Sequence, residues 1–286
     1  MHRIAFAIAL ALALAVFAGC GSSGSSTDSG EAAVVLATDC KPNKLDTQTK
    51  GQLTVATDKP AYPPYFVDDD PSNGKGFESA VAYAIADTIG YSKSDVNWVV
   101  EPFNSSYAPG PKDFDFDVNQ ISITPARAKQ VDFSTPYYTA NQAVVALKDS
   151  QAAKATSLAD LKDANIGVQI GTTSLDAVNS EIQPDQDPQV FNSSNDVVTA
   201  LKNGTVDVVV VDLPTALYLT AVQVPTAKVV GQFPAPGGDQ WGALLAKDSP
   251  LTACVSTAIE DLKANGQLQQ ITDKWMSQAA GAPVLR

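Results

Sequence analysis

From residue 53 onward, short apolar runs alternate with longer segments in which apolar residues recur every three or four positions. A short apolar run between turn signals predicts a buried strand, and the longer recurrence predicts an amphipathic helix. We expect strands at residues 53–57, 96–100, 118–123, 143–147, 166–170 and 206–211. We expect helices at residues 77–89, from 157, from 172, at 196–202, from 214, and at 251–265 and 268–276. This alternation of strands and helices indicates an α/β protein with parallel sheets covered by helices.

Local signals place several of the helix ends. Gly90 follows the apolar stripe of the first helix and is a good C-terminal cap. Ser157, with an acidic residue three positions later at Asp160, predicts a helix start. Pro214 stands where the first turn of a helix tolerates proline. Residues 206–211 are valine except at Asp207, which is typical of a strand buried on both faces of a parallel sheet.

The chain begins with a basic start and an apolar run over residues 4–18. The run is short for a membrane-spanning helix and has the form of a secretory leader. It ends in small residues before Cys20, which resembles the bacterial lipobox, in which the leader is removed and the cysteine is lipidated; Phe17 departs from the leucine usual in that motif. Residues 21–30 are mainly glycine and serine and predict a flexible tether. A buried helix with a chance cysteine is the alternative.

Charge and cysteine content narrow the function classes. The chain has 19 basic and 31 acidic residues, a net charge of −12, which argues against binding to nucleic acid or to anionic lipid through charge. With Cys20 assigned to lipid, Cys40 and Cys254 remain, and in an exported domain they form either a disulfide or two buried thiols. The only histidine is His2, so we expect neither a zinc site nor a cofactor.

Polar side chains gather at four places where a predicted strand ends, which is where an open α/β sheet binds its ligands. These segments are residues 57–66, 120–127, 169–173 and 211–214. Each one alone also fits an ordinary structural role: a surface turn with partly buried rings, a surface arginine, a helix cap, or an N-cap beside a proline.

Taken together, the four segments contain the groups that would hold a zwitterionic amino acid. The planar guanidinium of Arg127 matches a carboxylate with two parallel hydrogen bonds. The N–H of Thr173 at a strand-to-helix junction favours the same anion. Asp212, with the hydroxyl of Ser122, would hold an ammonium group.

The side chain of such a ligand would lie between the rings of Tyr62 and Phe103. Gln120 and Gln169 stand nearby in the predicted cleft and favour a polar side chain such as that of glutamine or glutamate. A cystine-like or basic ligand stays open.

These motifs resemble the polar-amino-acid family of solute-binding proteins of ABC transporters (extracellular solute-binding proteins, family 3). The resemblance covers about residues 50 to 280, and its most specific part is the run 121–138. The matching segments are residues 51–58, 62–64, 76–78, 121–127, 131–138, 171–173 and 206–212. The chain departs from the family pattern at residues 104–111, which are rich in helix breakers, and at Glu78, where aspartate is commoner.

The resemblance implies roles for individual residues. The carboxylate of the ligand falls on Arg127 and its ammonium group on Asp212, with accompanying hydrogen bonds from Ser122 and Thr173. The residues that would line the side-chain pocket are Asp58, Tyr62, Phe103, Gln120 and Gln169.

The implied fold is α/β, with two Rossmann-like lobes joined by a two-strand hinge, known as the type II periplasmic-binding-protein fold. We expect a signal peptide at residues 1–19, a lipid-anchored tether and N-terminal segment at 20–49, a first lobe from 50–139 plus 238–286, and a second lobe from 140–237. Closure of the lobes would bury the ligand.

The implied function is that of the extracytoplasmic substrate-binding component of an ABC importer. We expect a monomer, lipid-anchored to the outer face of the membrane, that delivers a small polar amino acid to the permease subunits. The alternatives are a ligand sensor for a membrane receptor and a dehydratase-like enzyme on the same fold. With no histidine beyond the leader, a Ser-His-Asp triad is excluded.

Overall fold

A computed structural model describes residues 39–235, 237–276 and 281–286. The predicted leader, the Cys20 lipidation site and most of the tether lie outside these residues. The described chain alternates strands with helices, so the α/β fold class is confirmed. No helix in this part of the chain combines the length and apolar character that a membrane crossing requires.

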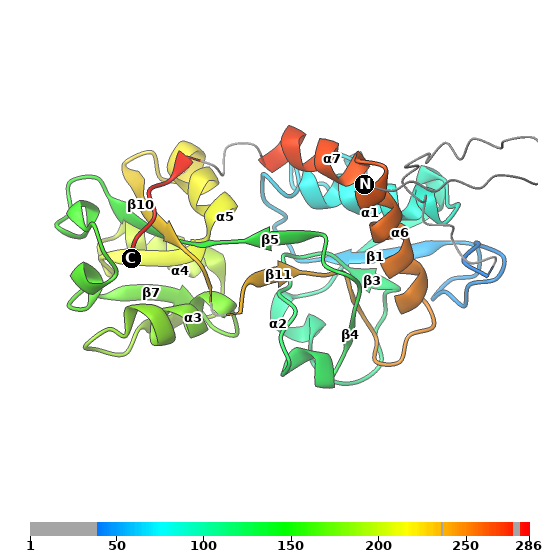
Figure 1. Ribbon diagram of the computed structural model, residues 1–286, viewed down its shortest axis with the longest axis horizontal. Helices are drawn as coiled ribbons and strands as arrows, with labels where there is room; N and C mark the ends of the chain where they lie inside the picture. Colours follow the sequence, from blue (N-terminus) through cyan, green and yellow to red (C-terminus); the bar gives the residue numbers. More distant parts are fainter. Residues whose placement is uncertain (1–38, 236, 277–280) are drawn as a thin grey trace, which may run out of the picture. The chain divides into compact units, whose positions relative to one another are not determined.

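The first sheet is built mainly from the N-terminal half of the described chain (Figure 1). Its strands are, in order, β2 (Val96–Val100), β1 (Leu53–Thr57), β3 (Phe116–Asp117), β12 (Leu244–Leu245) and β4 (Asp132–Phe133). β1 runs parallel to β2 and β3, whereas β12 runs antiparallel to β3 and β4. The predicted strand 118–123 is therefore wrong: the regular strand ends at Asp117, and Ser122 forms only an isolated antiparallel bridge with Trp241.

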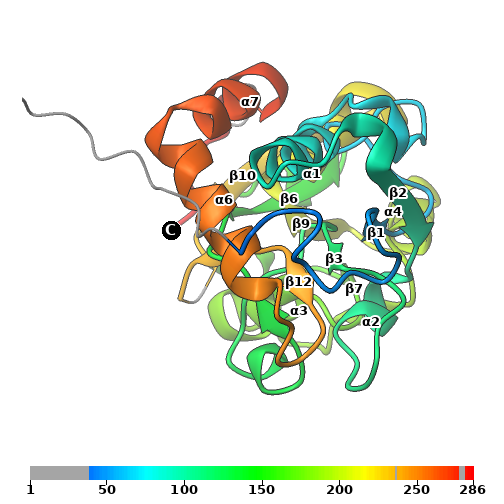
Figure 2. The same ribbon diagram turned by 90° about the vertical axis from the view of Figure 1, so that its right-hand side faces the viewer.

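Three helices cover one face of this sheet: α1 (Phe77–Thr88), α6 (Thr252–Ala264) and α7 (Gln267–Met276) (Figure 2). Their apolar stripes pack with Leu53 and Val55 of β1 in one buried cluster. The short α2 (Phe103–Ser106) is a single turn, as the helix breakers in residues 104–111 predict. The structure joins Cys40 to Cys254 of α6 by a disulfide, with the two Cα atoms 5.5 Å apart.

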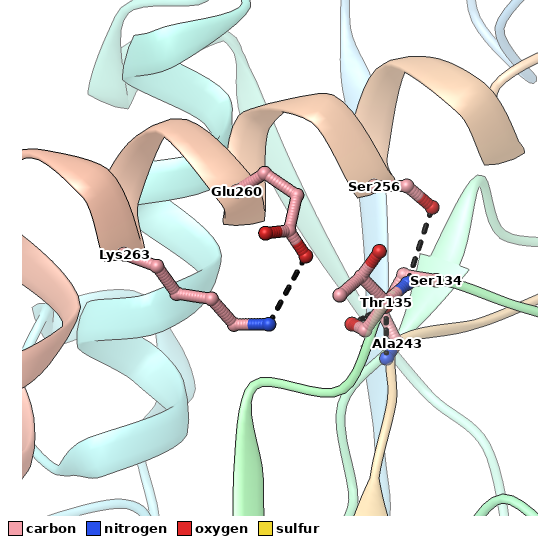
Figure 3. Close-up of polar contacts among 6 residues, drawn as sticks. All are labelled: Ser134, Thr135, Ala243, Ser256, Glu260 and Lys263. Atoms are coloured by element: carbon pink, nitrogen blue, oxygen red, sulfur yellow. Dashed lines mark hydrogen bonds and ion pairs between the residues drawn. The ribbon is translucent and has the colours of Figure 1, made fainter. Parts of the chain in front are cut away.

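Ser134 connects two neighbouring segments at the edge of this sheet (Figure 3). Its hydroxyl donates to the carbonyl of Thr135 and accepts the N–H of Ala243, at 2.8 and 2.9 Å. The N–H of Thr135 in turn donates to Ser256 of α6. These bonds connect residues 134 and 135 to the segment at Ala243 and to α6.

The second sheet has the strand order β10 (Ala227–Phe233), β6 (Gln142–Leu147), β9 (Val208–Asp212), β7 (Ile166–Gln169) and β8 (Gln189–Phe191). β9 and β8 run parallel to β7, but β6 is antiparallel to β9 and β10, so the sheet is mixed rather than parallel throughout. The valine strand is buried as predicted. α4 (Ser194–Lys202) and α5 (Leu213–Tyr218) pack on one face, and α3 (Thr173–Ala177) on the other.

The helix predicted from Ser157 is wrong, because only a 3-10 turn forms at Ala159–Leu161. β7 begins at Ile166, which leaves too few residues for a helix. The carboxylate of Asp160 accepts the N–H groups of Thr156 and Ser157 and so closes a local turn.

Two antiparallel strands connect the sheets: β5 (Tyr138–Ala140) and β11 (Asp239–Trp241). They lie side by side in Figure 1, where the chain was expected to cross between lobes. The last described residues, 281–286, pair with β10, and Leu285 packs in the core of the second sheet. This differs from the expected boundary, which assigns all of residues 238–286 to the first lobe.

Candidate functional site

A cavity of about 460 Å³ lies where loops from both sheets meet. It is lined from the first sheet by the loops after β1 and β2 and by residues 119–127, and from the second by the ends of β7 and β9 and by α4 and α5. The structure brings together in this lining all nine residues proposed for ligand binding, which are Asp58, Tyr62, Phe103, Gln120, Ser122, Arg127, Gln169, Thr173 and Asp212.

Arg127 is held in a fixed orientation at one end of the cavity. It is 8% exposed, and its guanidinium donates to the carbonyls of Ser122 (2.7 Å) and Gly171 (2.8 Å). The ring of Tyr107 lies 4.6 Å from the guanidinium carbon and that of Phe103 lies 5.6 Å away. Burial lowers the pKa of the guanidinium, which nevertheless stays protonated. Two of its five N–H groups are used, so others remain for a ligand carboxylate.

Gly171 makes this arrangement possible. Its φ of +73° is in the left-handed region, and a Cβ there would meet the hydroxyl of Tyr107 and the amide oxygen of Asn104. Any other residue would be strained and would also push Tyr107 away. Glycine therefore allows residues from the first sheet to approach a backbone carbonyl of the second.

The opposite charge lies at the end of β9. Asp212 is partly exposed toward the cavity, and its Oδ1 accepts the side-chain amide of Gln142 at 2.7 Å. The same Nε2 donates to Oδ2 of Asp239 at 2.6 Å. Removal from bulk water, together with the negative charge of Asp239, raises the pKa of Asp212 well above its ordinary value. The proposed ammonium site therefore contains two acids, of which sequence reasoning identified one.

Thr173 and Ser122 lie between these two charged ends. Their hydroxyls are 3.2 Å apart, and that of Thr173 also donates to Asp239 at 3.0 Å. The hydroxyl of Thr172 caps α3 by accepting the N–H of Leu175 at 3.3 Å. The side chains of Ser122 and Thr173 thus link the two sheets across the cavity.

Glu78 fixes one wall of the cavity from beneath. It is fully buried, and its carboxylate accepts the backbone N–H of Gln120 at 2.7 Å, the side-chain amide of Gln120, and the hydroxyl of Tyr137 at 2.5 Å. Gln120 has a φ of +49°, which is uncommon for a residue with a side chain. Burial raises the pKa of Glu78 to about 7, although the hydrogen bonds from Tyr137 and Gln120 act the other way. Glu78, where the chain departs from the family pattern, therefore directly supports Gln120, a residue proposed for ligand binding.

The far end of the cavity is closed by contacts between residues of the two sheets. The hydroxyl of Tyr62 donates to Asn195, and that of Tyr65 lies 2.8 Å from the hydroxyl of Thr215. Asp58 accepts the N–H groups of Lys59 (2.6 Å) and Phe103 (3.3 Å). Phe103 packs edge to face on Tyr107, and its ring lies 5.6 Å from the guanidinium carbon of Arg127.

Comparison with known proteins agrees with this architecture. The family model of bacterial extracellular solute-binding proteins, family 3, matches residues 53–278. The chain belongs to this family.

Among relatives of this solute-binding protein is the arginine-binding extracellular protein ArtP of Bacillus subtilis (strain 168), 28% identical over 275 residues, which cover 90% of this chain and 91% of ArtP. The L-cystine-binding protein TcyJ of Escherichia coli (strain K12) is 28% identical over 231 residues, covering 79% of this chain and 83% of TcyJ. A solved structure of an ancestral arginine-binding protein bound to glutamine superposes with a TM-score of 0.67 and 32% identity, covering 79% of this chain and 98% of that one.

The cavity of this solute-binding protein also contains polar residues that sequence reasoning missed. Asn119 lines it, and its buried side-chain amide nitrogen has no hydrogen-bond partner among the described residues. Asn195, at the start of α4, holds Tyr62. Asn119 stands next to Gln120 in the loop after a strand, which was a usable signal. Asn195 and Asp239 enter the site only through the packing of distant segments.

Proposed function

We propose that this chain binds a free α-amino acid in the cavity, as the substrate-binding component of an ABC importer. Arg127, with the N–H of Thr173, would take the ligand carboxylate, and Asp212, with the hydroxyl of Ser122, would take the ammonium group. One observation carries the proposal: a buried cation and an acid line the same cavity, and neither forms an ion pair with another side chain among the residues that the structure describes. A zwitterion supplies both missing partners. The proposal is binding without chemical conversion, consistent with relatives that are named for what they bind.

The far end of the cavity favours a side chain that donates hydrogen bonds. Asp58 and Asp212 are the two carboxylates among the described lining residues, and Asp58 lies near Tyr62. Lys59 also lines the cavity, but its ammonium group is 3.6 Å from Asp69. A guanidinium or amide group would find acceptors here, whereas a ligand carboxylate would face Asp58. We therefore propose arginine or glutamine ahead of glutamate.

A thermal-shift screen tests this proposal. A ligand that binds only the folded chain raises its melting temperature, and a hundredfold excess over Kd adds about 2.7 kcal/mol. We would screen L-arginine, L-lysine, L-histidine, L-glutamine, L-glutamate and L-cystine, with the D-enantiomers as controls. Stabilisation by L-arginine or L-glutamine, but not by the D-forms, is the expected result. No shift with any of the six would refute amino-acid binding.

We propose in addition that residues 1–19 are a signal peptide and that Cys20 carries a lipid that anchors the chain, as a monomer, to the outer face of the membrane beside its permease. The apolar run and the lipobox-like end support this proposal. Cys20→Ala should move the protein from the membrane fraction to the soluble fraction, as judged by immunoblot of fractionated cells. Retention in the membrane fraction would contradict the anchor.

We propose that residues 50–139 with 238–276 and residues 140–235 act as two lobes that close on the ligand, and that residues 281–286 move with the second lobe. Supporting this, β5 and β11 are the paired strands that pass between the sheets, and the residues proposed for each end of the ligand come from both sides. Small-angle scattering should show a smaller radius of gyration with L-arginine or L-glutamine, whichever binds. An unchanged radius would argue against closure.

A further inference from the structure

The acidic end of the cavity contains a pair of carboxyl groups bridged by one amide. The Nε2 atom of Gln142 lies 2.7 Å from Asp212 and 2.6 Å from Asp239, so each of its two N–H groups serves one carboxyl. The amide oxygen of Gln142 accepts the hydroxyl of Ser174 at 2.6 Å, which fixes this orientation of the amide. Gln142 is fully buried and Asp239 is 1% exposed. The geometry therefore places the two carboxyl groups close together, and that of Asp239 is shielded from solvent.

The polar partners of this pair are too few for two negative charges. Asp239 accepts from Gln142 and Thr173 through Oδ2, while its Oδ1 is buried and has no hydrogen-bond partner among the described residues. Among the described residues, the carboxyl group of Asp212 accepts a hydrogen bond only from Gln142. Two adjacent carboxyl groups that lack a cation do not both ionise readily, because each charge disfavours the other.

The surrounding elements supply one cation and two phenols. Arg127 is the cation that faces the pair, but its nearest acceptors are the carbonyls of Ser122 and Gly171. Tyr65 and Tyr138 face Asp212 from the first lobe and from β5, and burial raises the pKa of both phenols, to about 12 for Tyr138. Both therefore stay neutral at physiological pH.

We propose that Asp212 and Asp239 share one proton in the ligand-free cavity and release it to solvent when the ammonium group of an amino acid enters, so that Asp239 is the second acid of the ammonium site. This rests on the proposed function, in which Asp212 receives that ammonium group. The incoming ammonium group takes the place of the proton between the two carboxylates, while Arg127 pairs with the ligand carboxylate. The raised pKa of Asp212 agrees with a proton held there at neutral pH.

The sign of the pH dependence follows from this exchange. Below the pKa of the pair, binding must expel a proton, so affinity should rise with pH by up to about tenfold per unit. Above that pKa the proton is already lost, and affinity should become constant. Asp239→Asn leaves a single acid beside a neutral amide, so its affinity should depend much less on pH between 6 and 8.

Calorimetry on the full mature chain tests the exchange. Each of the six amino acids named above would be titrated at pH 7 in phosphate and in Tris, whose ionisation enthalpies differ, so that the difference in heat counts the protons released. We expect close to one proton per amino acid bound in the wild type and close to none in Asp239→Asn. Asp87→Asn, an exposed site on α1, is the matched control and should behave as the wild type. Equal proton counts in wild type and Asp239→Asn would overturn the proposal.

A measurement without ligand separates this proposal from the proposed function. Infrared spectroscopy of the ligand-free chain at pH 7 reports protonated carboxyl groups by their C=O stretch. The wild-type spectrum should show one more such group than Asp239→Asn, and Asp212→Asn should lose the same signal. If no amino acid binds, the proposed function fails, while the infrared comparison still decides whether the pair holds a proton. Identical spectra in all three proteins would refute proton sharing.

Discussion

The two ends of the cavity satisfy their buried charges in different ways. Arg127 is held by two backbone carbonyls and covered by two rings, none of which titrates near neutral pH. Asp212 and Asp239 are held by the side-chain amide of Gln142, and Asp239 also by the hydroxyl of Thr173. The cationic end is therefore built in advance, whereas the acidic end is incomplete until a cation arrives. Such a cavity has a preorganised binding site for a carboxylate. The protonation of its ammonium site depends on the ligand and on pH.

The largest effect on binding is expected from replacing Arg127, the cation at one end of the cavity. Arg127→Ala should weaken amino-acid binding by about 3–5 kcal/mol, because the ligand carboxylate would be buried without its charge partner. Lys129→Ala, an exposed cation on the same 3-10 turn, is the control and should bind normally. Calorimetry measures both variants. Affinity in Arg127→Ala equal to that of the control would remove Arg127 from the site.

A smaller effect is expected from disturbing what holds Arg127. Gly171→Ala places a side chain on a left-handed residue and against Tyr107, so we expect a loss of about 2–3 kcal/mol in unfolding free energy and weaker binding. Gly204→Ala isolates the backbone strain, since Gly204 has a φ of +67° and open space around it. It should cost about 1 kcal/mol and leave binding intact. Equal losses in both variants, by urea unfolding, would show that the contact with Tyr107 carries no weight.

The smallest effect concerns an acid outside the cavity. Asp117 of β3 is fully buried, accepts the hydroxyl of Ser106, and has its pKa raised by burial to about 8. The folded chain therefore holds this proton more tightly than the unfolded chain does, and the stability it contributes is lost as pH rises from about 4 to about 8. Asp117→Asn is neutral throughout, so relative to the wild type it should gain about 1–2 kcal/mol in unfolding free energy between pH 6.5 and pH 8.

Urea unfolding at pH 5, 6.5 and 8 measures this gain, with Asp87→Asn as an exposed control that should show none. Parallel pH profiles for wild type and Asp117→Asn would mean that Asp117 is ionised in the fold at pH 5. Asp117 can be compared directly with Asp212, because burial raises the pKa of both carboxyl groups but only Asp212 lines the cavity.

Prediction from sequence succeeded where the signal is local. The apolar stripe of α1, the buried valines of β9 and the hydroxyl-rich turn before Arg127 are each contained in a few consecutive residues. It failed where neighbours decide the outcome. Residues 118–123 have the composition of a strand, but after Val118 they leave the first sheet, and Ser122 bridges to Trp241 of β11 instead. A cap signal at Ser157 was not enough for a helix when β7 begins nine residues later.

The candidate site shows the same division. All nine proposed residues line the cavity. They were recognisable from sequence because they lie at or just after the ends of predicted strands, where an open α/β sheet binds its ligands. Asp239 carried no signal, because it lies in a segment that was expected only to cross between lobes. Its importance arises from Gln142, which is 97 positions away in the chain.

The sequence by itself therefore determined the α/β class, the order of elements and the charged residues available to a ligand, because apolar periodicity and side-chain chemistry are properties of short segments. Only the tertiary structure decided which charges are satisfied before a ligand arrives. Burial, the carbonyl of Gly171 beside Arg127 and the pairing of Asp212 with Asp239 depend on contacts between segments far apart in the chain. A pKa or a hydrogen-bond deficit follows from those contacts and from no single segment.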